Sequence, residues 1–313
     1  MLYRSLLAVA SLLAVMLASL LAVVLAALPW VSTAGAQVFD YGKYPDLRGQ
    51  WVRYGPSGPD LKGPLVRLGP SGVFRTRFDP TKPPGAGQQA PLTPEYQAIF
   101  EANLEDQAHG GQGTAQTFTC LSPGMPRATN GYGEIEFVVT PHTFYILVQH
   151  VDDDRRIYTD GRGWPAELEP TFLGYSIGKW IDTQGIGRYD LLEVETRGFR
   201  GPRAFDVTGA PLHKDNQTIV KERIYLDKAN PDILHDEVTV IDHALTRPWT
   251  VNKTYGREPN KEQPTWRDNN CGENNNHVKI GKENYMLSAD GYLMPTKKEQ
   301  SPPDLRYFTQ TQK

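Results

Sequence analysis

The chain has 313 residues, with 33 Lys or Arg against 36 Asp or Glu, and its formal net charge is −3. A nucleic-acid-binding face normally shows as an excess of basic residues, so this balance argues against a protein that binds DNA or RNA. The aromatic content of 10% supports a packed core and excludes a wholly disordered chain.

Residues 1–36 are typical of a secretion signal. One positive charge precedes residues 5–28, which are an almost unbroken run of Leu, Ala and Val. Ala34-x-Ala36 has the small-residue form that signal peptidase cleaves, which predicts a periplasmic or secreted mature chain. The apolar run is also long enough to span a bilayer, so an uncleaved membrane anchor is the alternative. After cleavage we expect no membrane span.

We expect residues 37–313 to form a single β-rich domain. Its first part, residues 37–113, is rich in Pro and Gly and predicts long loops around a strand near 47–54. The same part contains one short helix at 93–104. Residues 114–258 are predicted to form a β-meander, and the polar residues 259–313 an extended C-terminal strap.

The helix at 93–104 carries clear start signals. Thr93 is a good N-cap, and Pro94 suits the first helical position because its missing N–H has no partner there anyway. Helical spacing places Tyr96, Ile99 and Phe100 on one face, which we expect to be buried.

The middle of the chain repeats short β runs bounded by turn residues, including Asp152-Asp153-Asp154. The predicted strands are 134–140, 143–150, 155–159, 176–180, 189–196, 218–226, 234–241 and 249–255. Few segments with helical periodicity interrupt them, which argues against a doubly wound α/β sheet. The pattern predicts a mostly β fold, an antiparallel meander that closes into a barrel or forms a sandwich.

Two predicted strands carry carboxylates on an otherwise apolar face. Glu222 alternates with Ile224, and Asp236 alternates with Leu234 and Val238. Carboxylates on an inward face are costly unless they are paired. Either a bulge shifts the register, or these positions mark a polar patch inside a barrel.

The chain has two cysteines, Cys120 and Cys271. In an oxidising compartment they can join, closing a loop of about 150 residues that is worth roughly 5 kcal/mol in the chain-entropy model. Two buried free thiols are the alternative.

Seven segments of the mature chain carry a family resemblance. Three of them are RRIYTDGR at 155–162, LTRPWT at 245–250 and CGEN at 271–274. The other four are residues 45–51, 120–127, 174–180 and 222–224. Together they resemble a family of exported bacterial proteins with no assigned activity. The resemblance covers most of the mature chain and implies export and a β fold, but no chemistry. The chain departs from the family after Trp180, where residues 181–188 replace a short Gly-Asp turn.

Gly49-x-Trp51 is similar to the opening of lipocalin-type barrels, in which a Gly-x-Trp lies on the first strand. This second resemblance implies a barrel closed in the lipocalin manner.

The densest group of charged residues lies at 150–164. Arg156, Asp160 and Arg162 near a barrel rim could hold a carboxylate or phosphate by bidentate contacts. An ordinary hairpin with surface ion pairs is the alternative. We take Arg156, Arg162, Trp51, Tyr158 and Trp180 as candidate ligand-binding residues.

Catalytic candidates are His213, Glu222 and Asp160. His213 lies closest in sequence to Asp215 and Glu222, and a His–carboxylate pair there could act as a general base. A loop histidine with a structural hydrogen bond is the alternative. The histidines form no metal motif, and there is no Walker loop, dinucleotide fingerprint or Gly-x-Ser-x-Gly, so the sequence predicts no metal and no cofactor.

Two functions from different classes follow. The first is an exported β-barrel protein that binds a small apolar or aromatic ligand. The alternative is a periplasmic enzyme of hydrolase or lyase type, in which an Arg/Asp/His cluster acts on a small organic substrate. The sequence leaves open whether the protein is an enzyme, and it gives neither the ligand nor the oligomeric state.

Overall fold

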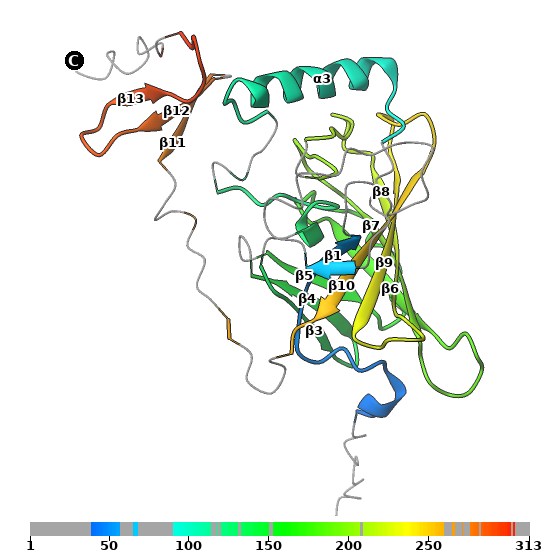
Figure 1. Ribbon diagram of the computed structural model, residues 1–313. Helices are drawn as coiled ribbons and strands as arrows, with labels where there is room; N and C mark the ends of the chain where they lie inside the picture. Colours follow the sequence, from blue (N-terminus) through cyan, green and yellow to red (C-terminus); the bar gives the residue numbers. More distant parts are fainter. Residues whose placement is uncertain are drawn as a thin grey trace, which may run out of the picture. The chain divides into compact units, whose positions relative to one another are not determined.

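Figure 1 shows the computed structural model of the chain. It describes residues 39–56, 65–67, 90–113, 117, 120–130, 133–149, 153–206, 209–259, 265–266, 271, 276–281, 283–301 and 303. Tyr41–Lys313 form one compact unit. The predicted signal segment lies outside the described residues. Within the described part, no helix has the length and apolar character that crossing a bilayer requires.

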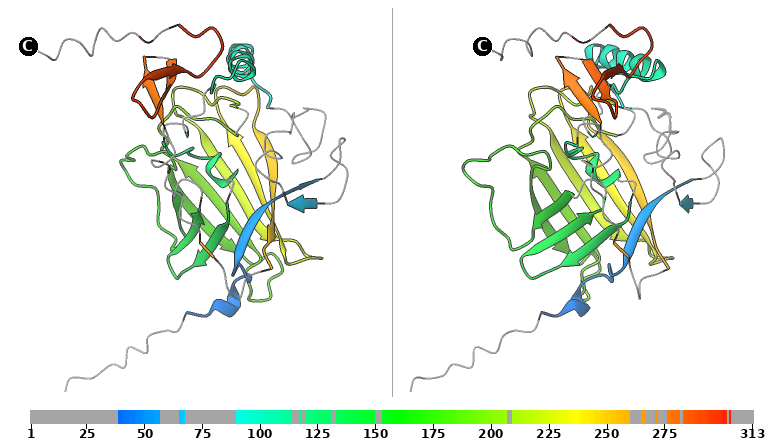
Figure 2. Two further views of the ribbon diagram at one scale, coloured as in Figure 1. Left: turned by 60° about the vertical axis from the view of Figure 1, so that its left-hand side comes forward. Right: turned by 90° about the vertical axis from the view of Figure 1, so that its left-hand side faces the viewer.

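Nine strands close into a barrel, which confirms the predicted mostly β fold (Figures 1 and 2). In chain order they are β1 (Gln50–Pro56), β3 (Ile135–Val139), β4 (Thr143–Val148), β5 (Asp153–Tyr158), β6 (Tyr175–Ile181), β7 (Leu191–Arg197), β8 (Ile219–Leu226), β9 (Ile233–Ile241) and β10 (Trp249–Arg257). Each strand pairs with the next, and β1 pairs with both β3 and β10, which closes the ring. All these pairs are antiparallel except β5–β6, which is parallel. The short β2 (Leu65–Arg67) pairs with the far end of β1.

The strand register follows from the alternation that the sequence shows. In β9 every second residue is buried, including Leu234, Asp236 and Val238. Glu222 of β8 lies opposite Val238, and Ile224 lies opposite Asp236, with no interruption of the ladder. A slip of one residue would turn the apolar side chains outward. Of the two interpretations of these carboxylates, the polar patch inside a barrel is therefore confirmed.

The parallel β5–β6 pair departs from the predicted antiparallel meander, and three further details differ from the sequence prediction. Asp153 and Asp154 belong to β5 rather than to a turn, because they pair with Val148 and Leu147 of β4. The buried Asp153 also accepts a hydrogen bond from the Ser122 hydroxyl at 2.8 Å. The helix α3 (Pro94–Ala108) is longer than expected, although Thr93 is its N-cap as predicted. The buried residues of α3 are Tyr96 and Phe100, which lie one turn apart on the same face. Ile99 lies beside that face and is 39% exposed.

Two apolar clusters fill the interior. The first contains Trp51, Phe144 and Leu192 from the barrel strands. The second contains Trp249 of β10 and Phe205, and it also includes Phe100 of α3. Phe100 joins α3 to this second cluster, and α3 packs over one end of the barrel (Figures 1 and 2). The short helix η1 (Tyr41–Lys43) lies at the opposite end.

The predicted C-terminal strap contains regular structure. Strands β11 (His277–Ile280), β12 (Glu283–Leu287) and β13 (Leu293–Pro295) form a small antiparallel sheet. The segment after this sheet contacts α3, since Lys297 Nζ lies 3.1 Å from Asp106 Oδ1. The sheet was missed because its strands have only three to five residues and stand in an otherwise polar part of the chain.

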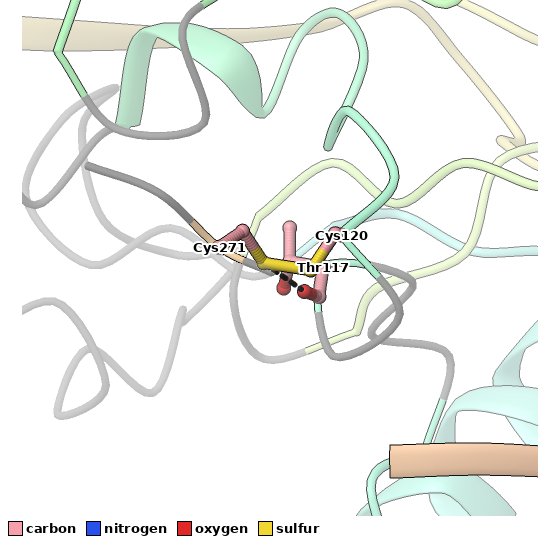
Figure 3. The surroundings of a disulfide bond; sticks show 3 residues. All are labelled: Thr117, Cys120 and Cys271. Carbon is pink, nitrogen blue, oxygen red and sulfur yellow. Dashed lines mark hydrogen bonds between the residues drawn. A yellow bond between two sulfur atoms is a disulfide. The ribbon is translucent and has the colours of Figure 1, made fainter. Parts of the chain in front are cut away.

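The predicted disulfide joins Cys120 to Cys271, with a Cα–Cα distance of 5.5 Å (Figure 3). The two residues are 151 positions apart, so the bond ties the C-terminal part to the loop before β3. The carbonyl oxygen of Thr117 lies 3.8 Å from Sγ of Cys271, which is a contact rather than a hydrogen bond because a disulfide sulfur carries no proton.

Candidate functional site

Charged side chains occupy the middle of the barrel. Arg155, Glu222, Asp236 and Lys253 are each at most 3% exposed, and Arg53 is half-buried beside them. We call these five residues the interior charge layer. Buried charges are stable only when other charges and hydrogen bonds compensate for the lost water.

Arg155 and Glu222 form the centre of this layer. Nη1 of Arg155 donates to Oε1 of Glu222 at 2.7 Å, and Nη2 donates to Oε2, so the pair is bidentate. Nη2 also donates to the Thr196 hydroxyl at 2.8 Å. Although burial opposes a charge here, the Glu222 carboxylate raises the pKa of Arg155 above its ordinary value. This geometry is that of a strong charge-assisted pair.

Lys253 and Asp236 lie opposite each other on β10 and β9. Nζ of Lys253 donates to the carbonyl oxygen of Pro126 at 2.5 Å and to the hydroxyl of Thr129 at 2.9 Å, both near the buried η3 (Ala128–Asn130). Burial lowers the pKa of Lys253. The buried Oδ1 of Asp236 has no hydrogen-bond donor among the described residues.

Asp236→Asn is expected to remove a pH dependence of stability. Burial, followed by repulsion from Glu222, raises the pKa of Asp236 from 3.8 to about 8. The folded state therefore keeps a proton that the unfolded state releases above pH 3.8. Stability from this group is complete below that pH and is lost as the pH rises toward 8, by up to about 1.4 kcal/mol per pH unit.

Urea unfolding of the wild type and Asp236→Asn between about pH 5 and 8 measures this slope. The wild type should lose stability relative to the variant as the pH rises. Asp154→Asn, which changes an exposed carboxylate on β5, is the matched control and should run parallel to the wild type. Equal slopes for all three proteins would contradict the assignment.

An open cleft lies at the barrel end that carries η1. Its volume is about 640 Å³. Its lining comes from η1 and the chain that leads to β1, from the end of β3 and from the β6–β7 loop: Tyr41, Gly42, Tyr44, Pro45, Asp46, Leu47, Arg48, Phe137, Val138, Val139 and Arg188. We call it the tyrosine cleft. Its walls are aromatic and aliphatic, and two arginines contribute the positive charge.

A chain of aromatic contacts supports the tyrosine cleft from behind. The ring of Tyr44 meets Trp180 edge-on at 5.2 Å, and Trp180 meets Phe144 at 5.6 Å. Phe144 in turn stacks on Phe137, which lines the cleft, at 5.6 Å. Nε1 of Trp180 is buried and has no hydrogen-bond acceptor among the described residues. The cleft wall is therefore continuous with the apolar core of the barrel.

The β6–β7 loop is held by its own carboxylates. Asp182 accepts hydrogen bonds from the backbone N–H groups of Gly185 at 2.8 Å and Gly187 at 2.6 Å. Both glycines have positive φ, +68° and +83°, which lets the chain fold around the carboxylate. The backbone N–H of Tyr189 donates to the carbonyl of Lys43 at 2.7 Å. These bonds fix the backbone on both sides of Arg188 next to η1.

The two arginines of the tyrosine cleft differ in their partners. Arg48 makes a bidentate pair with Asp46, at 2.8 and 3.0 Å, and its hydrogen bond lowers the pKa of Asp46 to about 2. Arg188 has no ion-pair partner among the described residues. The positive charge of Arg188 is thus available to an anionic ligand.

Of the predicted 150–164 cluster, Arg156, Asp160 and Arg162 lie on the outer surface, whereas Asp153 and Arg155 are buried. Residues 150–152 lie outside the described residues. Nη2 of Arg162 pairs with Oδ2 of Asp160 at 2.6 Å, and the Arg162 guanidinium lies 3.9 Å from the ring centroid of Tyr158. Arg156 is exposed on the outer face of β5, whereas its neighbour Arg155 points inward. The pair formed by Asp160 and Arg162 corresponds to the surface alternative considered from the sequence.

The remaining predicted residues have separate surroundings. Trp51 is completely buried, donates from Nε1 to the carbonyl of Leu47 at 3.0 Å and is covered by Arg257. Glu222 is paired with Arg155 inside the barrel, and Trp180 lies behind the tyrosine cleft.

His213 has its own partners in the loop before β8. It lies next to Asp215 and His243. The described residues therefore give Asp160, His213 and Glu222 different partners and do not join them into one cluster.

No protein-family model matches the chain, and no curated protein matches it in sequence. The resemblance to exported bacterial proteins therefore stays a prediction from motifs. What the fold and the site define is a closed β-barrel protein with an aromatic cleft at one end.

Proposed function

We propose that this protein is an exported binding protein that holds a small aromatic or apolar acid in the tyrosine cleft. The observation that carries the proposal is the combination of an aromatic and aliphatic lining with a rim arginine, Arg188, that has no ion-pair partner among the described residues. Apolar walls with a few placed polar groups are typical of small-molecule sites. The volume of about 640 Å³ suits a ligand of one or two rings.

Export is the second part of the proposal. Two features support it: the apolar segment that ends in Ala34-x-Ala36, and the disulfide between Cys120 and Cys271. Structural disulfides persist in oxidising compartments and are rare in the cytosol. Mass spectrometry of the natively produced protein tests this part, since we expect an N-terminus at Gln37 and no free thiol. A mature chain that retains residues 1–36 would instead support the anchor.

Arg188→Ala is expected to weaken the binding of an anionic aromatic probe and to leave the binding of a neutral one unchanged. The probes are anilinonaphthalene sulfonate and the neutral phenylnaphthylamine, both followed by fluorescence titration. Loss of one charge-assisted contact at a partly exposed site should raise the dissociation constant of the sulfonate about tenfold. The affinity for phenylnaphthylamine should stay within about twofold. Arg156→Ala, which removes an exposed arginine on β5, is the matched control.

A second pair of variants tests the aromatic wall. Tyr41 lines the cleft, so Tyr41→Ala should weaken the binding of both probes. Because Tyr41 is 66% exposed, the substitution should not unfold the protein. Tyr292 is 72% exposed and lies just before β13, so Tyr292→Ala should leave both affinities unchanged. If Tyr41→Ala and Arg188→Ala both bind like the wild type, the ligand site is elsewhere.

The alternative is a hydrolase- or lyase-type enzyme, and it rests on Arg156, Asp160, Arg162, His213 and Glu222 converging on one substrate. Glu222 instead neutralises Arg155, and Asp160 neutralises Arg162. We therefore favour binding over catalysis by that cluster.

A further inference from the structure

We propose that His213, Asp215 and His243 form a binding site for one divalent first-row metal ion such as Zn²⁺ or Co²⁺. The three residues come from two loops at the end of the barrel that α3 covers. His213 and Asp215 precede β8, and His243 follows β9. Their ligand atoms all lie within 4.8 Å of one another.

The distances suit a shared ion. Nδ1 of His213 lies 2.9 Å from Oδ1 of Asp215, and Nδ1 of His243 lies 2.6 Å from Oδ2. Tetrahedral metal bonds of about 2.0–2.2 Å place two neighbouring ligand atoms roughly 3.3–3.6 Å apart. The two printed separations are shorter than this, so each histidine nitrogen must move away from the carboxylate by roughly 1 Å or less to admit the ion. Two imidazoles and a carboxylate are ligands that zinc and other first-row ions accept.

The environment of His213 Nδ1 favours a cation. This nitrogen lies 2.9 Å from the Asp215 carboxylate and 3.2 Å from the backbone nitrogen of the same residue. A proton between the nitrogen and the carboxylate gives an ordinary His–carboxylate hydrogen bond, and a metal ion would take the place of that proton.

Surrounding residues hold the two loops in place. The buried Asp242 accepts the backbone N–H of His213 and the backbone N–H of Ala244, both at 2.8 Å, so one carboxylate ties together the two histidine-bearing loops. The ring of Tyr96 on α3 packs against His213 at 5.1 Å. Such outer contacts orient metal ligands before the ion binds.

The side chains leave room for further ligands. The His243 side chain is 69% exposed, and those of His213 and Asp215 are 22% and 30% exposed. A first-row ion with three protein ligands keeps positions open for water or another small molecule. The ligand set was not visible as a sequence motif because His213 and His243 are separated by the whole β8–β9 hairpin.

The test is a titration of the purified protein, prepared without a histidine tag and stripped with a chelator, with Co²⁺ and then Zn²⁺. We expect one Co²⁺ per chain, a ligand-field absorption band, and displacement of Co²⁺ by Zn²⁺. His243→Ala and Asp215→Asn should each weaken binding at least tenfold. The exposure of His243 predicts that His243→Ala folds, which far-ultraviolet circular dichroism checks.

His109→Ala is the matched control. His109 is an exposed histidine whose Nδ1 lies 3.3 Å from the Glu105 carboxylate, so it offers a His–carboxylate pair without a second histidine. The affinity of the His109→Ala protein for Co²⁺ should stay within about twofold of the wild-type affinity. Binding at less than one equivalent, or equal affinity in His243→Ala, Asp215→Asn and His109→Ala, overturns the proposal.

Discussion

Glu222→Gln is expected to lower the free energy of unfolding by about 3–5 kcal/mol. The substitution keeps the shape of the side chain but removes the negative charge that the bidentate contact with Arg155 requires. Arg155 is only 2% exposed, so its guanidinium would remain as an uncompensated buried charge. Urea unfolding at neutral pH measures the loss as a lower midpoint with an unchanged m-value.

Glu237→Gln is the matched control on the neighbouring strand. Glu237 pairs with Arg223 at 3.0 Å, but these side chains are 30% and 53% exposed. Exposed pairs of this kind contribute about 1 kcal/mol or less, so the control should lose little stability. A second check is Arg155→Met combined with Glu222→Leu, which removes both charges and should cost less than Glu222→Gln alone. If Glu222→Gln loses no more than Glu237→Gln, the buried pair does not hold the barrel together.

The strands could be predicted from the sequence because their signal is local. In β8 and β9 the alternation of buried and exposed residues lies within eight or nine consecutive residues. The same alternation correctly placed Glu222 and Asp236 on the inward face. What the sequence left open was whether the inward face tolerates them, and this depends on partners from other strands.

The partner of Glu222 lies 67 residues away, so only the closed barrel brings it near. The sequence drew attention to Arg156 because it stands in the same run as Asp160 and Arg162. Strand geometry places Arg155 and Ile157 inside and Arg156 outside. The sequence did contain a signal for the buried pair. Arg155 alternates with the apolar Ile157, and Glu222 alternates with the apolar Ile224, so both side chains are expected to point inward. Their opposite charges then predict that they pair.

The tyrosine cleft was beyond prediction for a different reason. It is built from η1, the end of β3 and the β6–β7 loop, which are far apart in the chain. Residues 181–188 looked irregular, yet the Asp182 carboxylate gives this loop its form by binding backbone N–H groups. Side-chain-to-backbone bonds of this kind leave no periodic pattern in a sequence.

Replacing Cys120 and Cys271 together by Ser is expected to lower the free energy of unfolding by about 5 kcal/mol. The bond closes a loop over 151 positions, and a link over a long loop strongly restricts the unfolded chain. The folded barrel should persist, because its nine strands pair with one another without help from the link. Urea unfolding of the double variant and the oxidised wild type measures the difference.

Two controls separate the link from other effects of the substitutions. Wild-type protein treated with a thiol reductant should lose the same free energy as the double variant, because both lack the bond. Cys120→Ser alone should match the double variant, since either change opens the loop. A loss below about 1 kcal/mol in all three would contradict the expectation. It would mean that residual structure in the unfolded chain already restricts the ends of this loop.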